Sequence, residues 1–113
     1  MAWTLDARLP VRFGTLDQAG AETALLIEGD APAPPGVPVA RFVEAAGAHP
    51  AGCACCTPRG PAAEALGRLF LERARGGSLF REVVAVTRGP EGAAAVRAAL
   101  AADPLVAARF RPG

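Results

Sequence analysis

A short apolar run, Val83-Val84-Ala85-Val86, constrains the fold of this chain more than any other feature. Charged residues precede it and Gly89-Pro90 follows it. A strand with one exposed face alternates apolar and polar residues, whereas a strand buried on both faces is apolar at consecutive positions. The run therefore predicts a buried strand within 80–87, at the centre of a sheet that is covered by other elements.

Two segments with helical patterns flank this strand. The first, residues 61–75, begins with a proline at the first helical position and ends at Gly76-Gly77. Its expected apolar face consists of Ala62, Leu66, Leu69 and Phe70. The second, residues 91–102, is rich in alanine, and Asp103-Pro104 predicts the start of a last helix that runs through Phe110.

The first half of the chain is divided by turns and prolines. Residues 9–13 alternate like a short strand, whereas residues 21–28 have the composition of a helix but contain the strand-like triplet Leu25-Leu26-Ile27. Residues 31–38 hold four prolines and form a stiff connector. A second strand is expected within 37–43, where Pro38 limits it to a sheet edge or to a start at Val39. Alternating strands and helices predict an α/β fold with a small, partly open parallel sheet and flanking helices, in a three-layer or partly open arrangement.

Length and charge limit the possible functions. The 113 residues suffice for one small domain, 1–113, and 12 basic against 11 acidic residues give a net charge of +1. That balance argues against nucleic acid or an anionic membrane as the main partner. The sequence shows neither a secretory signal nor an apolar segment long enough to cross a bilayer, so we expect a cytoplasmic protein whose thiols stay reduced.

The loop at residues 49–60 contains all three cysteines and the only histidine. Cys53 and Cys56 form a C-x-x-C pair, with Cys55 between them. Thiolates are preferred ligands of zinc and copper(I). The sequence therefore predicts a transition-metal site, with zinc as the first candidate, made by Cys53, Cys55 and Cys56. His49, a water molecule or a partner chain would supply the fourth ligand.

Two other interpretations of the cysteines stay open. Free cysteines are often buried as small apolar residues, although packing does not explain their clustering. Cys53 and Cys56 also have the spacing of a thiol redox pair. In a thioredoxin-like protein that pair would start a helix after a strand near the N-terminus, whereas here it follows a Pro/Gly-rich segment in mid-chain.

The segment Gly52-Cys53-Ala54-Cys55-Cys56-Thr57-Pro58-Arg59-Gly60 resembles the G-C-x-C-C-T-x-R-G-D motif of the CobW-type GTPases, the metallochaperone branch of the P-loop NTPases. The resemblance extends through Glu64-Ala65-Leu66 and 80–87 to the segment 100–111. Pro61 replaces the final acidic residue of the motif. The resemblance implies a P-loop NTPase-like fold and a role in binding or delivering a metal ion.

Residues 1–30 resemble a P-loop region only in degenerate form. Leu16, Ala19 and Ala21 stand where the family has glycines, and Glu22 stands where it has the phosphate-binding lysine. A glutamate there would repel phosphate, and the chain contains no lysine at all. The acidic residue of the family's E-T-T-G segment becomes Val86, and an N-K-x-D segment is impossible without asparagine or lysine.

The chain is therefore expected to be a truncated pseudo-GTPase that keeps its metal loop and binds no nucleotide. Its expected partners are a metal ion and either a second copy, through an open sheet edge, or a full-length CobW-type GTPase. The alternatives are a GTP-binding CobW-like protein and a thiol redox protein.

Two charged sets are interpreted as solvated surface: Asp17, Glu22, Glu28 and Asp30 in loops, and Arg68, Arg73 and Arg75 on a helix.

Overall fold

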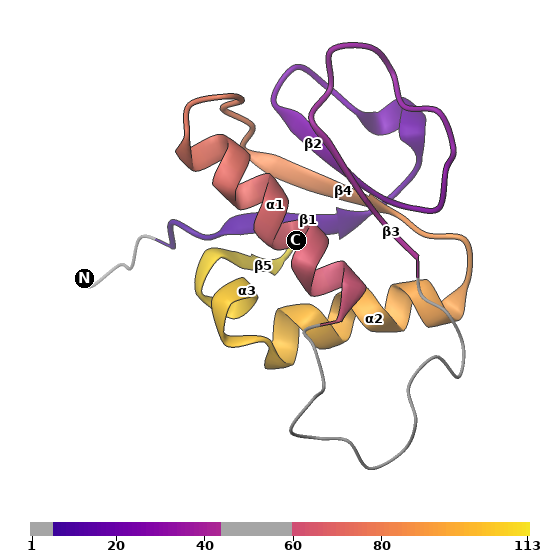
Figure 1. Ribbon diagram of the computed structural model, residues 1–113, viewed down its shortest axis with the longest axis vertical. Helices are drawn as coiled ribbons and strands as arrows, with labels where there is room; N and C mark the ends of the chain where they lie inside the picture. The colour runs from indigo at the N-terminus through magenta and orange to yellow at the C-terminus, as the bar shows by residue number, and fades with distance from the viewer. Residues whose placement is uncertain (1–5, 44–59) are drawn as a thin grey trace, which may run out of the picture.

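All five strands of the structure, a computed structural model that describes residues 6–43 and 60–113, belong to one parallel sheet. They are β1 (Leu9–Phe13), β2 (Thr23–Glu28), β3 (Val39–Phe42), β4 (Glu82–Val86) and β5 (Phe110–Pro112). Their order across the sheet is β3-β2-β4-β1-β5 (Figure 1). The apolar run 83–86 thus lies in the central strand, as its sequence predicted.

The second strand resolves the ambiguity of residues 21–28. Every residue of β2 is buried, and β2 pairs with β4 on one side and β3 on the other, with Leu25 opposite both Val84 and Val39. Consecutive large apolar residues suit a strand that is covered on both faces. Gly29 directly follows this strand, with a φ of 97° that favours glycine.

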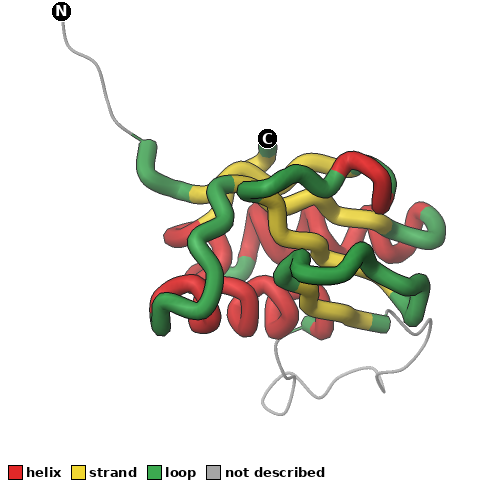
Figure 2. The backbone as a smooth tube through the Cα atoms, turned by 90° about the horizontal axis from the view of Figure 1, so that it is seen from above, coloured by secondary structure: helices red, strands yellow, loops and turns green. Residues whose placement is uncertain are grey.

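Three helices cover one face of the sheet (Figure 2): α1 (Pro61–Ala74), α2 (Pro90–Ala102) and α3 (Pro104–Arg109). Their buried residues share one apolar cluster with the strand residues of that face, which include Val11, Leu26 and Val83. The predicted apolar face of α1 is confirmed, with Leu66 and Leu69 fully buried. Asp103 caps α3 as expected, because its side chain accepts hydrogen bonds from the N–H groups of Leu105 and Val106.

Connecting segments, not helices, cover the opposite face of the sheet. Leu25, Ile27 and Val84 are buried there beneath residues of the β1–β2 and β2–β3 connections. The covering residues are Leu16, Ala19, Ala31, Ala33 and Val37. The first of these connections contains a short 3-10 turn, η1 (Leu16–Gln18). Of the two expected arrangements, the structure therefore has the partly open one, with helices on a single face.

The last strand was not expected from the sequence. The predicted helix through Phe110 is wrong at its end, because α3 stops at Arg109 and Phe110 begins β5. Phe110 is buried in the helix-covered core, where its ring meets the ring of Phe70 edge to face at 6.1 Å.

No helix in the described parts of the chain has the length and apolar character needed to cross a membrane.

Candidate functional site

The carboxyl ends of β2 and β4 form the place where the topology of this sheet favours a ligand. The two strands are neighbours, but β2 leads to β3 on one side, whereas β4 leads through α2 and α3 to β5 at the far edge. In open parallel sheets, a crevice forms where the connections of adjacent strands leave in opposite directions, and ligands commonly bind there. We call this place, made by residues 28–30 and 86–92, the β2–β4 crevice after its topology; the side chain of Glu28 occupies it.

Glu28, the last residue of β2, lies in the β2–β4 crevice with only 6% of its surface exposed. Its carboxylate Oε1 accepts a hydrogen bond from the backbone N–H of Arg88 at 2.6 Å. The interpretation of Glu28 as a solvated loop charge is therefore wrong, although Asp17, Glu22 and Asp30 are exposed as expected. Among residues 6–43 and 60–113, no other acidic or basic residue is buried.

The first turn of α2 borders this carboxylate. Gly89 is the N-cap, and a Cβ atom at Gly92 would overlap both the Cδ and the Oε1 of Glu28. The absence of a side chain at Gly92 thus leaves the space that the carboxylate fills. Because the N-terminal end of a helix carries partial positive charge, the start of α2 stabilises a carboxylate at this position.

Two guanidinium groups border the other side of the crevice. The Arg88 side chain lies against Gly29, where an added Cβ would be 2.9 Å from Arg88 Nη1. Arg41 Nη1 donates hydrogen bonds to the carbonyl oxygens of Gly29 at 3.2 Å and Ala31 at 2.8 Å. Both arginines are exposed, and they lie against the residues that directly follow the buried Glu28.

The region expected to be a degenerate P-loop has a different structure from a P-loop. A P-loop joins a strand to the N-terminus of a helix, and the phosphates bind at that terminus. Here β1 leads through η1 into β2, and the aligned residue Glu22 lies before β2, at the amino end of the strand. Glu22 forms an exposed ion pair with Arg81 Nε at 2.6 Å. The position that the family gives to its lysine is thus at the opposite edge of the sheet from the β2–β4 crevice.

The four predicted metal ligands, Cys53, Cys55, Cys56 and His49, lie outside the described residues. The chain enters their segment after Val43, beyond the carboxyl end of β3, and leaves it at Gly60, the N-cap of α1. Arg68 of α1 ties these two elements together, because its Nη2 donates a hydrogen bond to the carbonyl oxygen of Arg41 in β3 at 2.9 Å. In residues 6–43 and 60–113, no three histidine, cysteine or acidic side chains gather in a way that could hold a metal ion.

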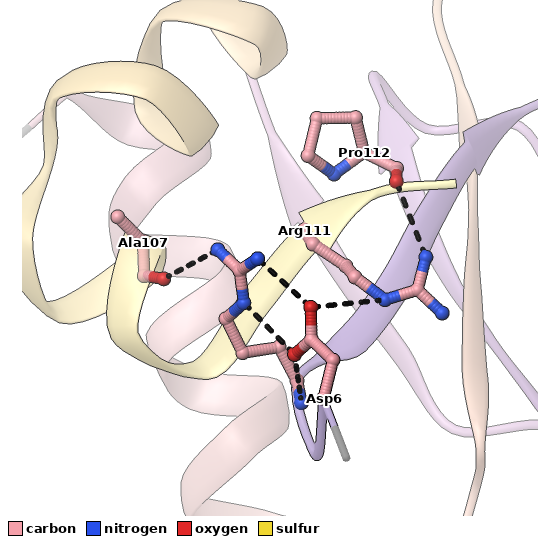
Figure 3. Close-up of polar contacts among 5 residues, drawn as sticks. Asp6, Ala107, Arg111 and Pro112 are labelled. Atoms are coloured by element: carbon pink, nitrogen blue, oxygen red, sulfur yellow. Dashed lines mark hydrogen bonds and ion pairs between the residues drawn. The ribbon is translucent and has the colours of Figure 1, made fainter. Parts of the chain in front are cut away.

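A cluster of charged residues joins the start of β1 to β5 (Figure 3). Asp6 accepts hydrogen bonds from the Nε and Nη2 of Arg8 and lies 3.8 Å from Arg111 Nε. Arg8 also reaches the carbonyl oxygen of Ala107 in α3. Hydrogen bonds from Arg8 lower the pKa of Asp6 from its usual 3.8 to about 2. No local pattern in the sequence indicates this cluster, whose contacts hold the segment before β1 against α3 and β5.

An open groove of about 490 Å³ follows the helix-covered side of β1 where the short β5 ends. Its walls include Val11, Phe13, Leu100 and Pro112. The guanidinium of Arg97 stacks on the exposed ring of Phe13 at 4.8 Å. The lining is mostly apolar, its charged members are Arg12 and Arg97, and none of its described residues is an acid or a nucleophile that would indicate a reaction.

A comparison of the chain with protein-family models, curated proteins and solved structures found no match. The resemblance to the CobW-type GTPases thus depends on the residues quoted above.

Proposed function

We propose that this protein binds a transition-metal ion, zinc in the first instance, through Cys53, Cys55 and Cys56. One observation carries the proposal: three thiols lie within four consecutive residues, close to the only histidine of the chain. Zinc is held by thiolates and imidazoles, most often four in number in structural sites. Three thiolates leave one position for His49 or for a group from outside.

The attachment of the cysteine segment supports this proposal. The segment connects the carboxyl end of β3 to the start of α1, and the loops that carry binding residues in parallel α/β proteins leave the sheet at its carboxyl edge. The hydrogen bond from Arg68 to the Arg41 carbonyl holds the two flanking elements together. Ligands on a segment whose two ends are fixed lose less conformational entropy when they converge on an ion.

The same proposal assigns no GTPase activity to the protein. The chain has no lysine, and β1 is followed by η1 and β2 where a phosphate-binding helix would be needed. The buried carboxylate of Glu28 lies in the β2–β4 crevice, where it would repel a nucleotide phosphate. The protein would therefore store or hand over the metal ion in the cytoplasm, alone, as a homodimer or beside a full-length CobW-type GTPase.

Metal analysis of the protein purified without an affinity tag tests this function. We expect about one zinc ion per chain, lost when all three cysteines are replaced by serine. Cys53→Ser or Cys56→Ser should weaken zinc binding more than His49→Ala, because the pair spaced by two residues is the core of the site. Binding should also weaken below neutral pH, since the thiols must lose their protons.

Three results would count against the proposal or a part of it. If the wild type binds no more zinc than the triple-serine variant, the metal site does not exist. A reversible Cys53–Cys56 disulfide without zinc binding would then indicate a thiol redox protein. GTP binding at micromolar concentration in calorimetry would contradict the pseudo-GTPase part alone.

A further inference from the structure

The open groove of about 490 Å³ beside the end of β5 has the size and lining of a small-molecule site. Such sites are concave and mostly apolar, about 300–1,000 Å³ in volume, with a few polar groups that orient the ligand. We propose that this groove binds a small carboxylic acid with an apolar body, such as a medium-chain fatty acid, with the carboxylate at Arg97. The inference uses only described residues and is independent of the proposed metal site.

The groove exists because β5 is shorter than the strand with which it pairs. β5 pairs with Leu9–Val11 of β1, and the N–H of Gly113 donates a hydrogen bond to the carbonyl oxygen of Val11 at 2.8 Å. Phe13, the last residue of β1, has no partner in β5. Backbone N–H groups alternate between the two sides of a strand, so that of Phe13 faces the side on which β5 has ended. The groove therefore lies at the carboxyl end of a parallel strand, where ligands of α/β folds commonly bind.

The walls of the groove suit an apolar ligand body. Leu100 and Ala101 of α2 line it together with Val11 and Phe13 of β1 and with Pro112. The ring of Phe13 is 38% exposed, although Val11, two residues earlier on the same face, is buried. A ligand in the groove would cover this ring, and the removal of apolar surface from water favours binding.

Arg97 gives the groove its preference for an anionic group. Its guanidinium stacks on the ring of Phe13 at 4.8 Å, and its side chain forms no ion pair with another described residue. Arg12, the other cation of the lining, already pairs with Glu82, with 3.1 Å between Nε and Oε1. Stacking orients a guanidinium and leaves the N–H groups at its edge free to bind a carboxylate in bidentate geometry.

The spacing along α2 determines where the two parts of the ligand would lie. Arg97, Leu100 and Ala101 follow one another at i, i+3 and i+4, so they share one face of the helix. A ligand of this class would place its carboxylate at Arg97 and its apolar body along Leu100 and Ala101. None of the described lining residues is acidic, so no side chain of the groove would repel the carboxylate.

Titration of the protein with octanoate, octanol and acetate, followed by the amide NMR signals of Phe13 and Arg97, tests this inference. Octanol has the apolar body without the charge, and acetate has the charge without the body. We expect octanoate to shift both signals in a saturable way and octanol to bind at least about fivefold more weakly, because it lacks the charge-assisted hydrogen bonds. Acetate should cause no saturable shift over the same concentration range.

Two pairs of variants separate the effects of charge and shape. Arg97→Gln should remove the preference for octanoate over octanol, whereas Arg75→Gln, which removes an exposed charge at the end of α1, should keep it. Ala101→Phe should fill the groove and abolish the binding of octanoate. Ala102→Phe is its matched control, because Ala102 is also exposed on α2 but does not belong to the lining of the groove.

The inference is overturned if octanol binds the wild type as tightly as octanoate does, because Arg97 would then recognise no carboxylate. Failure of octanoate to shift either signal would overturn it too. So would equal octanoate affinity in Ala101→Phe and the wild type, since the ligand would then bind elsewhere. None of these results bears on zinc binding by the three cysteines, which the metal analysis tests separately.

Discussion

Arginine side chains hold several parts of this protein in place by binding backbone carbonyl oxygens. Arg41 binds the carbonyls that follow β2, Arg68 binds the carbonyl of Arg41, and Arg73 Nε donates to the carbonyl of Phe80 at 2.8 Å. Arg73, expected on an exposed helix face, is half-buried. Arg97 and Arg109 stack instead on phenylalanine rings, at 4.8 and 4.4 Å. A planar guanidinium suits these roles better than the single ammonium of lysine, a residue that the chain lacks.

At the same scale, Gly92→Ala tests how tightly Glu28 fits beside α2. Alanine is normally better than glycine in a helix by roughly 0.5–1 kcal/mol. Here its Cβ would overlap the buried carboxylate, so we expect the free energy of unfolding to fall by about 1–3 kcal/mol in urea denaturation. Gly20→Ala is the control for adding a methyl group, because an added Cβ there would meet only Thr23 Oγ1 at an ordinary 3.6 Å. A Gly92→Ala variant as stable as the wild type would show that Glu28 can move aside.

Among the elements, β2 shows that helices cover one face of the sheet and connecting segments cover the other. Leu26 is buried under the helices and Leu25 under the connecting segments, and both are fully buried. We expect Leu25→Ala and Leu26→Ala each to lower the free energy of unfolding by about 2–5 kcal/mol. Leu79→Ala is the control, because that side chain is 74% exposed. A cost for Leu25→Ala as small as that of the control would mean that the connections cover their face only loosely.

The elements also differ in how well local sequence predicts them. The run 83–86 and the helix at 61–75 were identified correctly, because their apolar patterns reflect burial by many partners at once. Residues 21–28 stayed ambiguous, because helix propensity competed with a pairing to β4 that lies far along the chain. The three-residue strand β5 was missed, since only its pairing with Leu9–Val11 makes it a strand.

The candidate crevice could be predicted least of all. Glu28 is charged, follows an apolar run and precedes glycine, which locally indicates a solvated turn. Its burial depends on an N–H group 60 residues away and on the missing side chain of Gly92. A buried carboxylate at a strand end can be inferred only once the strand order is known. The cysteine cluster, in contrast, is a purely local signal, and the metal site inferred from it stays a prediction.

At the scale of the whole molecule, the described residues already form a sheet with a continuous helical core. Among the described residues, 6–43 and 60–113, the helix-side cluster joins strands β1 to β5 with all three helices. Small domains that need a metal ion to fold have too little apolar core to fold alone. This core is continuous, so its stability should not depend on a metal ion bound by Cys53, Cys55 and Cys56.

Removal of the metal by a chelator therefore distinguishes a transferable ion from a structural one. If the protein binds zinc as proposed, a chelator should strip the ion while the circular dichroism spectrum stays unchanged. The Tm should fall by less than about 4 °C, which is the shift that a loss of about 1 kcal/mol would cause in a domain of this size. The triple-serine variant should melt at the same temperature with or without the chelator, which controls for effects of the chelator itself. Cooperative unfolding of the wild type on chelation would instead assign the zinc ion a structural role, because the free energy of binding would then be part of the free energy of folding. Zinc that leaves a folded protein is available to a second protein, as storage or handover of the ion requires.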